Sequence, residues 1–224
     1  MTSLCRGILA LGGKENARGV HATLGRPAGR VQLPHYFPYG LKEYCRRGRK
    51  NLFPDLYGCP NPCCWYEGRL HRHGFYTRNA LSILFTSTAV IQRYLCPRCK
   101  KTVSILPTYF APHFQYSYAC IVFALYLLAV CRLTMSDIAA TINEFSGQLK
   151  MSYQHIAFYR NRLWRNTPLV IMFFGSIGVI LAEYDAPSSL RFIGNVLEGL
   201  EELGMDYFTI MYFHFHKKHL MSKR

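Results

Sequence analysis

Residues 59–99 read CPNPCCWYEGRLHRHGFYTRNALSILFTSTAVIQRYLCPRC, in which two groups of cysteines enclose a β-prone segment. The first group is CPNPCC, and the second, CPRC, begins 32 residues after the last cysteine of the first. A structural zinc ion takes four ligands in a tetrahedron, and two tight turns brought together by a hairpin can supply them without a large core. The segment therefore predicts a small β zinc ribbon with zinc as its cofactor.

The zinc ligands are expected among the five cysteines of these two groups. Cys96 and Cys99 have the two-residue separation of a zinc knuckle. Cys59 pairs with Cys63 or with Cys64, since three and four intervening residues both lie within the known range. The spacing does not choose between them. Four thiolates would leave no ligand position open to water, so a structural ion is favoured over a catalytic one.

Three strands are expected in and after this segment, at residues 69–78, 89–95 and 102–106, the last ended by Pro107. A His-x-His pair, His71 and His73, lies on the first strand, where alternation puts both rings on one face. The two histidines are alternative zinc ligands, but partial exposure near phosphate-binding arginines is the favoured role. The arginines expected to contact DNA here are Arg69, Arg72 and Arg78.

Basic residues dominate the chain, with 27 Lys and Arg against 12 Asp and Glu and a formal charge of +15. The net charge is +8 for residues 1–50, +5 for 51–110 and +3 for 111–165, whereas residues 166–224 carry −1. A strongly basic chain attracts polyanions, so nucleic acid is the expected partner and its contacts should precede residue 166. A basic run at 46–50 is either a phosphate contact or a solvated loop.

The cysteine count indicates a reducing compartment, and the apolar runs are too short to cross a membrane. Nine cysteines is an odd number, and no secretion signal pattern is evident, so metal binding in a cytoplasmic protein is the expectation. Residues 119–131 and 169–182 are apolar runs shorter than the roughly 18 to 20 residues needed to cross a bilayer. Both are expected to be buried helices.

Helical patterns follow the ribbon. We expect a buried helix at 116–132, a second at 134–145 capped by Thr134 and stopped at Gly147, and a third at 152–165 capped by Ser152. Two short helices joined by a turn and preceded by a longer one are typical of a trihelical DNA-binding unit, although amphipathic helices of ordinary all-α domains share this spacing.

In such a unit the last helix lies in the major groove and its first turns face the base edges. Gln154 suits adenine, Arg160 suits guanine or phosphate, and residues further along the helix suit the DNA backbone. Phe158, Tyr159 and Trp164 are expected in the core because of their helical spacing. The expected DNA-contacting residues are Ser152, Tyr153, Gln154, His155, Arg160, Arg162 and Arg165.

Beyond Pro168, which is expected to end the third helix, the chain is apolar and nearly neutral. A helix is expected at 195–203, with Val196, Leu197 and Leu200 on its buried side. The aromatic ending at 208–219 fits either a strand or a helix. We expect this region to pack against the trihelical unit or to form a dimer contact.

With CPNPCC, GRLHRHGFYTR, RYLCPRCKKTVSILP and SYQHIAFYRNRL, the chain resembles, over about residues 34–165, an uncharacterised bacterial family related to the N-terminal DNA-binding regions of insertion-sequence transposases. That family has two cysteine knuckles followed by a helix-turn-helix. The resemblance implies DNA binding in a mobile-element setting and a ligand set of Cys59, Cys64, Cys96 and Cys99. Cys63 and Trp65, which stands where such knuckles often carry glycine, are departures.

The sequence as a whole predicts an α+β fold, a small β zinc ribbon followed by a mainly α-helical helix-turn-helix region. The expected divisions are a disordered extension at 1–33, a basic lead-in and ribbon at 34–110, the trihelical unit at 111–168 and an apolar helical region at 169–224. A transposase also needs three carboxylates on a separate α/β domain. The acids after residue 165 do not fit such a set, so we assign no catalytic residue and expect no enzymatic activity from this chain alone.

The expected partner is duplex DNA, with a homodimer left open, no small-molecule substrate and a membrane disfavoured. Two alternatives remain. One is a small membrane-associated basic protein whose apolar runs form a hairpin, and the other is a non-catalytic subunit of a transposition complex.

Overall fold

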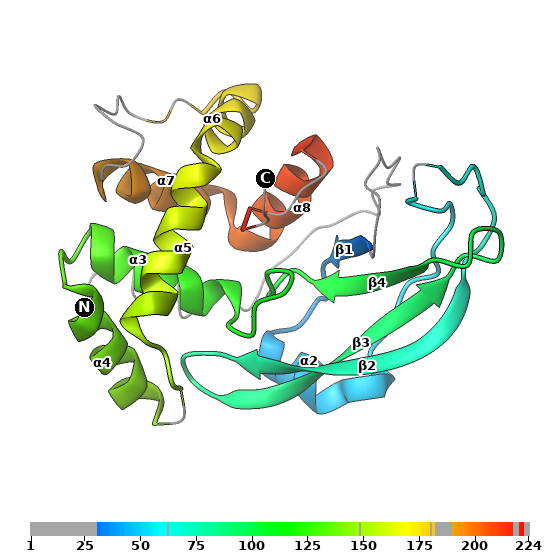
Figure 1. Ribbon diagram of the computed structural model, residues 1–224, viewed down its shortest axis with the longest axis horizontal. Coiled ribbons are helices and arrows are strands. Elements are labelled where there is room, and N and C mark those ends of the chain that lie inside the picture. Colours follow the sequence, from blue (N-terminus) through cyan, green and yellow to red (C-terminus); the bar gives the residue numbers. More distant parts are fainter. Residues whose placement is uncertain are drawn as a thin grey trace.

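The computed structural model describes residues 31–61, 63–147, 149–179, 181, 190–216 and 220–221. A sheet with one short helix forms one side of the molecule, and the remaining helices form the other (Figure 1). The α+β class is confirmed. The elements are β1 (Val31–His35), α2 (Leu41–Arg47), η1 (Gly48–Lys50), β2 (His71–Leu81), β3 (Thr86–Leu95), β4 (Thr102–Pro107), α3 (Tyr118–Ala129), α4 (Met135–Ser146), α5 (Tyr153–Arg165), α6 (Thr167–Ser176), α7 (Leu190–Leu203) and α8 (Met205–His216).

The sheet has four strands in the order β1-β4-β3-β2, not the three that the sequence predicted. β1 runs parallel to β4, with Leu33 opposite Ile105. It was missed because its sequence, VQLPH, is short and contains a proline, which a strand tolerates only at an edge such as this one. Most of the predicted 1–33 extension lies outside the described residues, but 31–33 belong to this strand.

β2 and β3 form a long antiparallel hairpin, paired from His71 opposite Leu95 to Leu81 opposite Thr86. Both strands extend further toward the turn than predicted, and β2 begins at His71 instead of Arg69. The register shifts between Arg72 and Phe75, where Gly74 has φ 92°, a left-handed conformation that a bulge requires and glycine tolerates.

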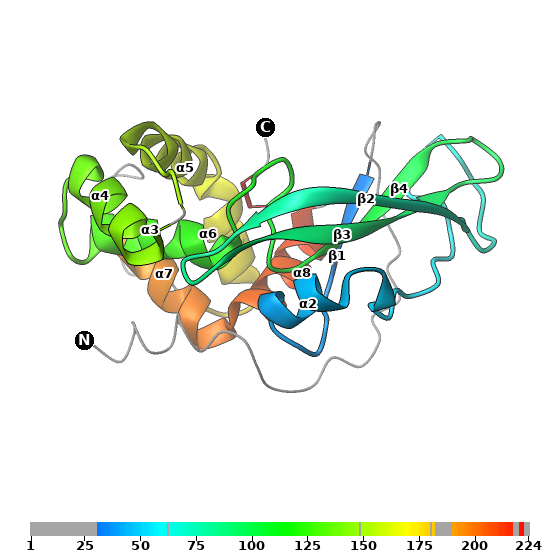
Figure 2. The same cartoon turned by 90° about the horizontal axis from the view of Figure 1, so that it is seen from below.

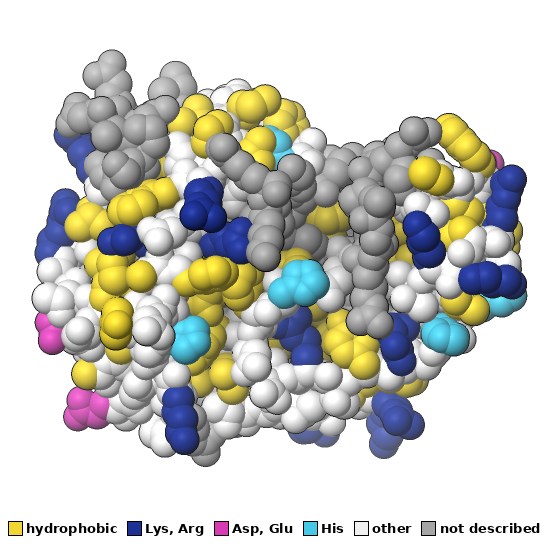
Figure 3. Space-filling model, viewed as in Figure 1, with side chains coloured by type: hydrophobic (Ala, Val, Ile, Leu, Met, Phe, Trp, Pro, Cys, Tyr) yellow, Lys and Arg dark blue, Asp and Glu magenta, His cyan; other side chains and the backbone are white. Residues whose placement is uncertain are grey.

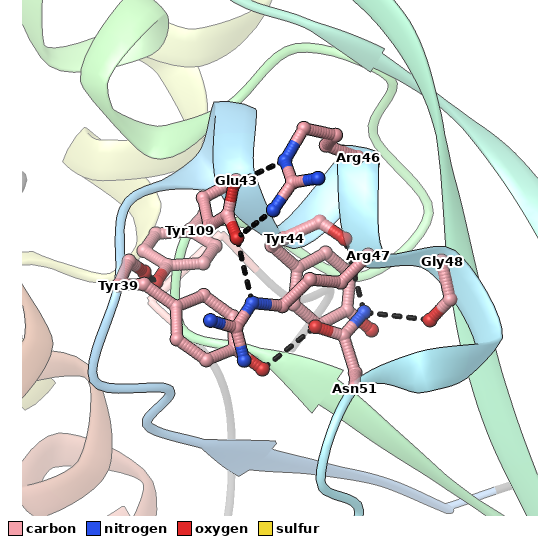
Figure 4. Close-up of polar contacts among 8 residues, drawn as sticks. All are labelled: Tyr39, Glu43, Tyr44, Arg46, Arg47, Gly48, Asn51 and Tyr109. Atoms are coloured by element: carbon pink, nitrogen blue, oxygen red, sulfur yellow. Dashed lines mark hydrogen bonds and ion pairs between the residues drawn. The ribbon is translucent and has the colours of Figure 1, made fainter.

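The basic run at 46–50, for which the sequence left a phosphate contact or a solvated loop open, is helical. Arg46 and Arg47 lie on α2, and both donate to Glu43 (2.6–2.7 Å), as Figure 4 shows. The Arg47 guanidinium also stacks over the Tyr39 ring at 4.3 Å. Tyr44, fully buried, fixes α2 against β3. Glu43 therefore partly neutralises this run, which the local composition alone did not reveal.

The helical side is built around α3, whose side chains are almost all buried and which α4, α5 and α7 contact. The predicted limits of α4 hold to within a residue: Thr134 accepts from the Asp137 N–H (3.2 Å), and Gly147 closes the helix with φ 65°. α5 begins after Ser152 as predicted. The prediction for Pro168 was wrong, since α5 ends at Arg165 and this proline lies in the first turn of α6, where its missing N–H is not needed.

The C-terminal helices join the same core. Val196, Leu197 and Leu200 are buried on α7 as predicted, and α7 packs on α3. The aromatic ending forms a helix, α8, which also contacts β1 and so links the two sides of the molecule. None of the helices in the described ranges combines the length and the apolarity that crossing a bilayer requires.

Candidate metal centre

Four cysteine sulfurs converge at one end of the sheet. The Sγ atoms of Cys59, Cys64, Cys96 and Cys99 all lie within 4.8 Å of one another. Cys59 Sγ is 3.6 Å from Cys99 Sγ, and Cys64 Sγ is 3.7 Å from Cys96 Sγ. A tetrahedron with zinc–sulfur bonds of about 2.3 Å has edges of about 3.8 Å. The cluster therefore has the size of a four-thiolate zinc site and could hold a metal ion.

The first pair of cysteines is held by a narrow loop. The N–H of Gly58 donates to the carbonyl of Gly68 (3.1 Å), and the N–H of Cys59 donates to that of Tyr66 (2.7 Å). Within the turn, the N–H of Cys64 donates to the carbonyl of Asn61 (2.9 Å). These bonds fold CPNPCC back on itself so that its first and last cysteines face the same point.

The second pair lies on the turn between β3 and β4. The N–H of Cys96 donates to the carbonyl of Lys101, and the N–H of Lys100 donates to that of Cys96, both at 3.0 Å. Lys100 has φ 58°, so the chain reverses sharply just after Cys99. Because β3 and β4 are paired up to this turn, the sheet fixes Cys96 and Cys99 opposite the first loop.

The structure separates the two neighbouring cysteines of the first group. The Cys64 side chain is 7% exposed and belongs to the sheet-side core, whereas Cys63 is exposed and outside the cluster. The Trp65 side chain is 73% exposed, so a large residue fits where such knuckles often have glycine. His71 and His73 are exposed on β2 and are not members of the metal-binding cluster found among the described residues.

The thiols of the cluster differ in acidity. Burial raises the pKa of Cys59 and Cys64. At Cys99 burial acts in the same direction, but hydrogen bonds from the Lys101 backbone and the Asn61 side chain outweigh it and lower the pKa to about 6. The pKa of Cys99 therefore shifts in the opposite direction to those of Cys59 and Cys64. Metal ligation requires thiolates, so it would release protons from any ligand thiol that is protonated before the ion binds.

Four sulfur ligands at this spacing favour zinc among the common divalent ions, because thiolates are soft donors and zinc takes four of them in a tetrahedron. Cys96 is fully buried and Cys64 nearly so, while Cys59 and Cys99 are half-buried, so the cluster has one closed side and one side nearer to solvent. The site suits a structural ion that holds the loop at 57–69 against the sheet. Asn61 supports this site through its side-chain hydrogen bond to Cys99. The sequence analysis did not single it out, because its position between the first two ligands was the only feature that pointed to such a role.

The arginines near the cluster have different surroundings. Arg69 and Arg72 are more than half exposed and share Asp55, at 2.7 Å and 3.3 Å. Such exposed ion pairs contribute little stability. Arg78 differs from the expectation, since it lies over the Phe110 ring (4.6 Å) and donates to the Ala111 carbonyl, and burial lowers its pKa.

The residues expected at the start of α5 lie on its surface. Tyr153 is 54% exposed, and Gln154 and His155 are also exposed. Ser152 and His155 form a reciprocal cap, in which each side chain bonds the other residue's backbone N–H. Ser152 and His155 therefore cap the N-terminus of α5, whether or not they also contact DNA.

The arginines of α5 divide into two kinds. Arg160 stacks on Trp164 (4.3 Å) and is partly exposed, and Arg165 is exposed at the end of the helix. Arg162 is only 9% exposed, with its guanidinium 4.9 Å from the centre of the Phe158 ring. The expected backbone contact by Arg162 therefore does not fit its position. Phe158, which was expected in the core, is 41% exposed and has this arginine against its ring.

Comparisons of the chain with known protein families, curated proteins and solved structures gave no match.

Proposed function

We propose that this chain binds duplex DNA, with a structural zinc ion holding the ribbon and α5 lying in the major groove. In this proposal it acts in a mobile-element setting, as a transposase-derived regulator or as a non-catalytic subunit of a transposition complex, and has no catalytic domain of its own. The observation that carries the proposal is the surface of α5.

α5 is amphipathic in the manner that groove binding needs. Ile156, Tyr159 and Leu163 are at most 2% exposed and pack it against α3 and α4. The opposite side presents Gln154 and Arg165 to solvent, and the helix contains no acidic residue. A helix fixed by its apolar stripe and polar on the other side can enter the groove without exposing the core.

The surface around α5 is basic. In Figures 1 and 2, α5 lies on the outside of the helical side, away from α2. On the face drawn in Figure 3, Lys and Arg side chains are spread from the helices to the sheet, and the few acidic ones lie at the edges. Phosphates along a duplex would therefore meet cations at several points, which supplies affinity without sequence preference.

The experiment is selection from a random duplex library at moderate salt, followed by anisotropy titrations of the selected sequence. Gln154→Ala should relax the preference at one base pair, at a cost of about 1–3 kcal/mol. Arg165→Ala should weaken binding to all sequences and reduce the salt slope by about 1. No enrichment of any sequence would remove base reading from the proposal, and no duplex binding would remove the proposal itself.

A charge-matched control is available on α2. Lys42 is exposed there, and α2 lies below the sheet in Figure 2, on the side away from α5. Lys42→Ala removes one positive charge, as Arg165→Ala does, but it should leave the affinity within about twofold of the wild type at moderate salt, because α2 faces away from α5 and exposed charges are screened over about 10 Å. Equal losses in both variants would point to net charge instead of α5.

A further inference from the structure

An open hollow of about 510 Å³ lies where the sheet meets the first turns of α5. It is bounded by the end of β2, the loop between β4 and α3, and the segment that leads into α5. None of the described residues that line it is acidic. They are Leu81, His113, Phe114, Gln115, Tyr116, Lys150, His155 and Tyr159.

Aromatic rings form one wall of the hollow. Tyr116 and Tyr159 are 6% and 2% exposed, with ring centroids 6.3 Å apart. Phe114 packs edge-on against Tyr159 at 5.6 Å. These rings belong to or pack against the helical core, so their positions are fixed before any ligand arrives. Because Tyr116 and Tyr159 are almost fully buried, the partly exposed ring of Phe114 is the one that a flat, apolar ligand group can pack against, and the two tyrosines hold it in place.

The rim carries hydrogen-bond donors. The Ser152 N–H donates to His155 Nδ1 (3.1 Å), so in the neutral ring the proton lies on Nε2, which is left to donate. The His155 ring is held edge-on against Tyr116 at 5.4 Å. Lys150 and His113 are exposed, and Lys150 takes part in none of the ion pairs found in the described ranges. The rim therefore suits an anion.

We propose that the hollow takes one nucleotide of the bound DNA that has left the base stack. Its base packs against the aromatic wall, and its phosphate meets Lys150 and the imidazole donors. The volume lies within the range of small-ligand sites, and stacking on fixed aromatic rings accepts any base. This inference rests on the proposed function, because only a duplex lying along α5 would bring a nucleotide to this place.

The test compares two probes, a short fluorescein-labelled duplex and a series of the same duplex carrying one unpaired adenosine at successive positions. An unpaired base costs least to bring out of the stack, so it exposes the contribution of the hollow. The wild type should bind one member of the series about tenfold more tightly than the matched duplex, given the usual contribution of one stacked base.

Three variants locate that preference. Lys150→Ala and Phe114→Leu should each reduce it to about twofold or less, while Lys42→Ala should keep it. His155 is left unchanged because it also caps α5, and thermal unfolding should show the same Tm for each variant to within a few degrees.

The outcomes separate the two proposals. Matched duplex binding without any preference for the unpaired base would overturn this inference alone. A preference that survives both Lys150→Ala and Phe114→Leu would likewise overturn the assignment to this hollow. The absence of binding to every duplex would overturn the proposed function together with it.

Discussion

The Cys64→Ser variant should lose zinc, and the neighbouring Cys63→Ser variant should keep it. Cys64 Sγ lies within 4.8 Å of the other three sulfurs, whereas Cys63 is exposed and outside the cluster. A structural zinc site has an apparent binding free energy of about 10–16 kcal/mol at neutral pH, which divides into about 2.5–4 kcal/mol for each of four ligands. The loss at Cys64 should therefore lower zinc affinity by a factor of about 100 to 1,000.

The assay is zinc per chain by elemental analysis after dialysis against a chelator of graded strength, together with thermal unfolding of each variant. The wild type and Cys63→Ser should carry one equivalent and unfold alike, since an exposed substitution usually changes the free energy of unfolding by less than about 0.5 kcal/mol. Cys64→Ser should lose its zinc to a weaker chelator than the wild type and Cys63→Ser do. Retention of a full equivalent by Cys64→Ser, or equal loss from both variants, would refute the geometric argument, and folded wild-type protein without zinc would refute the site.

Two further predictions concern stability. Burial lowers the pKa of His35 to about 4 from 6.5, so the unfolded chain binds this proton first and the free energy of unfolding falls as pH drops below 6.5, by about 2 kcal/mol at pH 5. Urea unfolding at pH 6.5 and at pH 5 should show a smaller fall in the free energy of unfolding for His35→Leu than for the wild type. Identical falls in the wild type and the variant would contradict this prediction. Thr134→Ala removes the cap on the Asp137 N–H and should cost about 1 kcal/mol, or about 2–4 °C in Tm. The exposed neighbour variant Ser136→Ala should change little, and an unchanged Tm in Thr134→Ala would show that the cap contributes nothing.

Local signals accounted for much of the helical side. The limits of α4 and α5 follow from Thr134, Gly147 and Ser152, each of which acts on backbone groups within a few residues. The local signal at Pro168, which lies in the first turn of α6, was ambiguous. A proline stops one helix or starts the next, and the proline alone does not decide which.

The sheet side depended more on distant partners. β1 is a strand because β4, about 70 residues later, offers it an edge, and nothing in VQLPH announces that pairing. Two other outcomes depended on neighbours one helical turn away. On α2, Glu43 reaches Arg46 and Arg47 and partly neutralises the basic run. On α5, Arg162 was expected on the surface, but it is buried and lies against the Phe158 ring.

The sequence by itself determined the two cysteine groups, the hairpin between them, the caps of α4 and α5 and the basic character of the chain up to residue 165, because each of these is encoded in neighbouring residues. Spacing left Cys63 and Cys64 equivalent, and the tertiary structure placed only Cys64 in the cluster. The tertiary structure also paired β1 with β4, buried Arg162 and formed the hollow beside α5. Those outcomes depend on which side chains meet after the chain has folded, and spacing along the sequence does not contain that information.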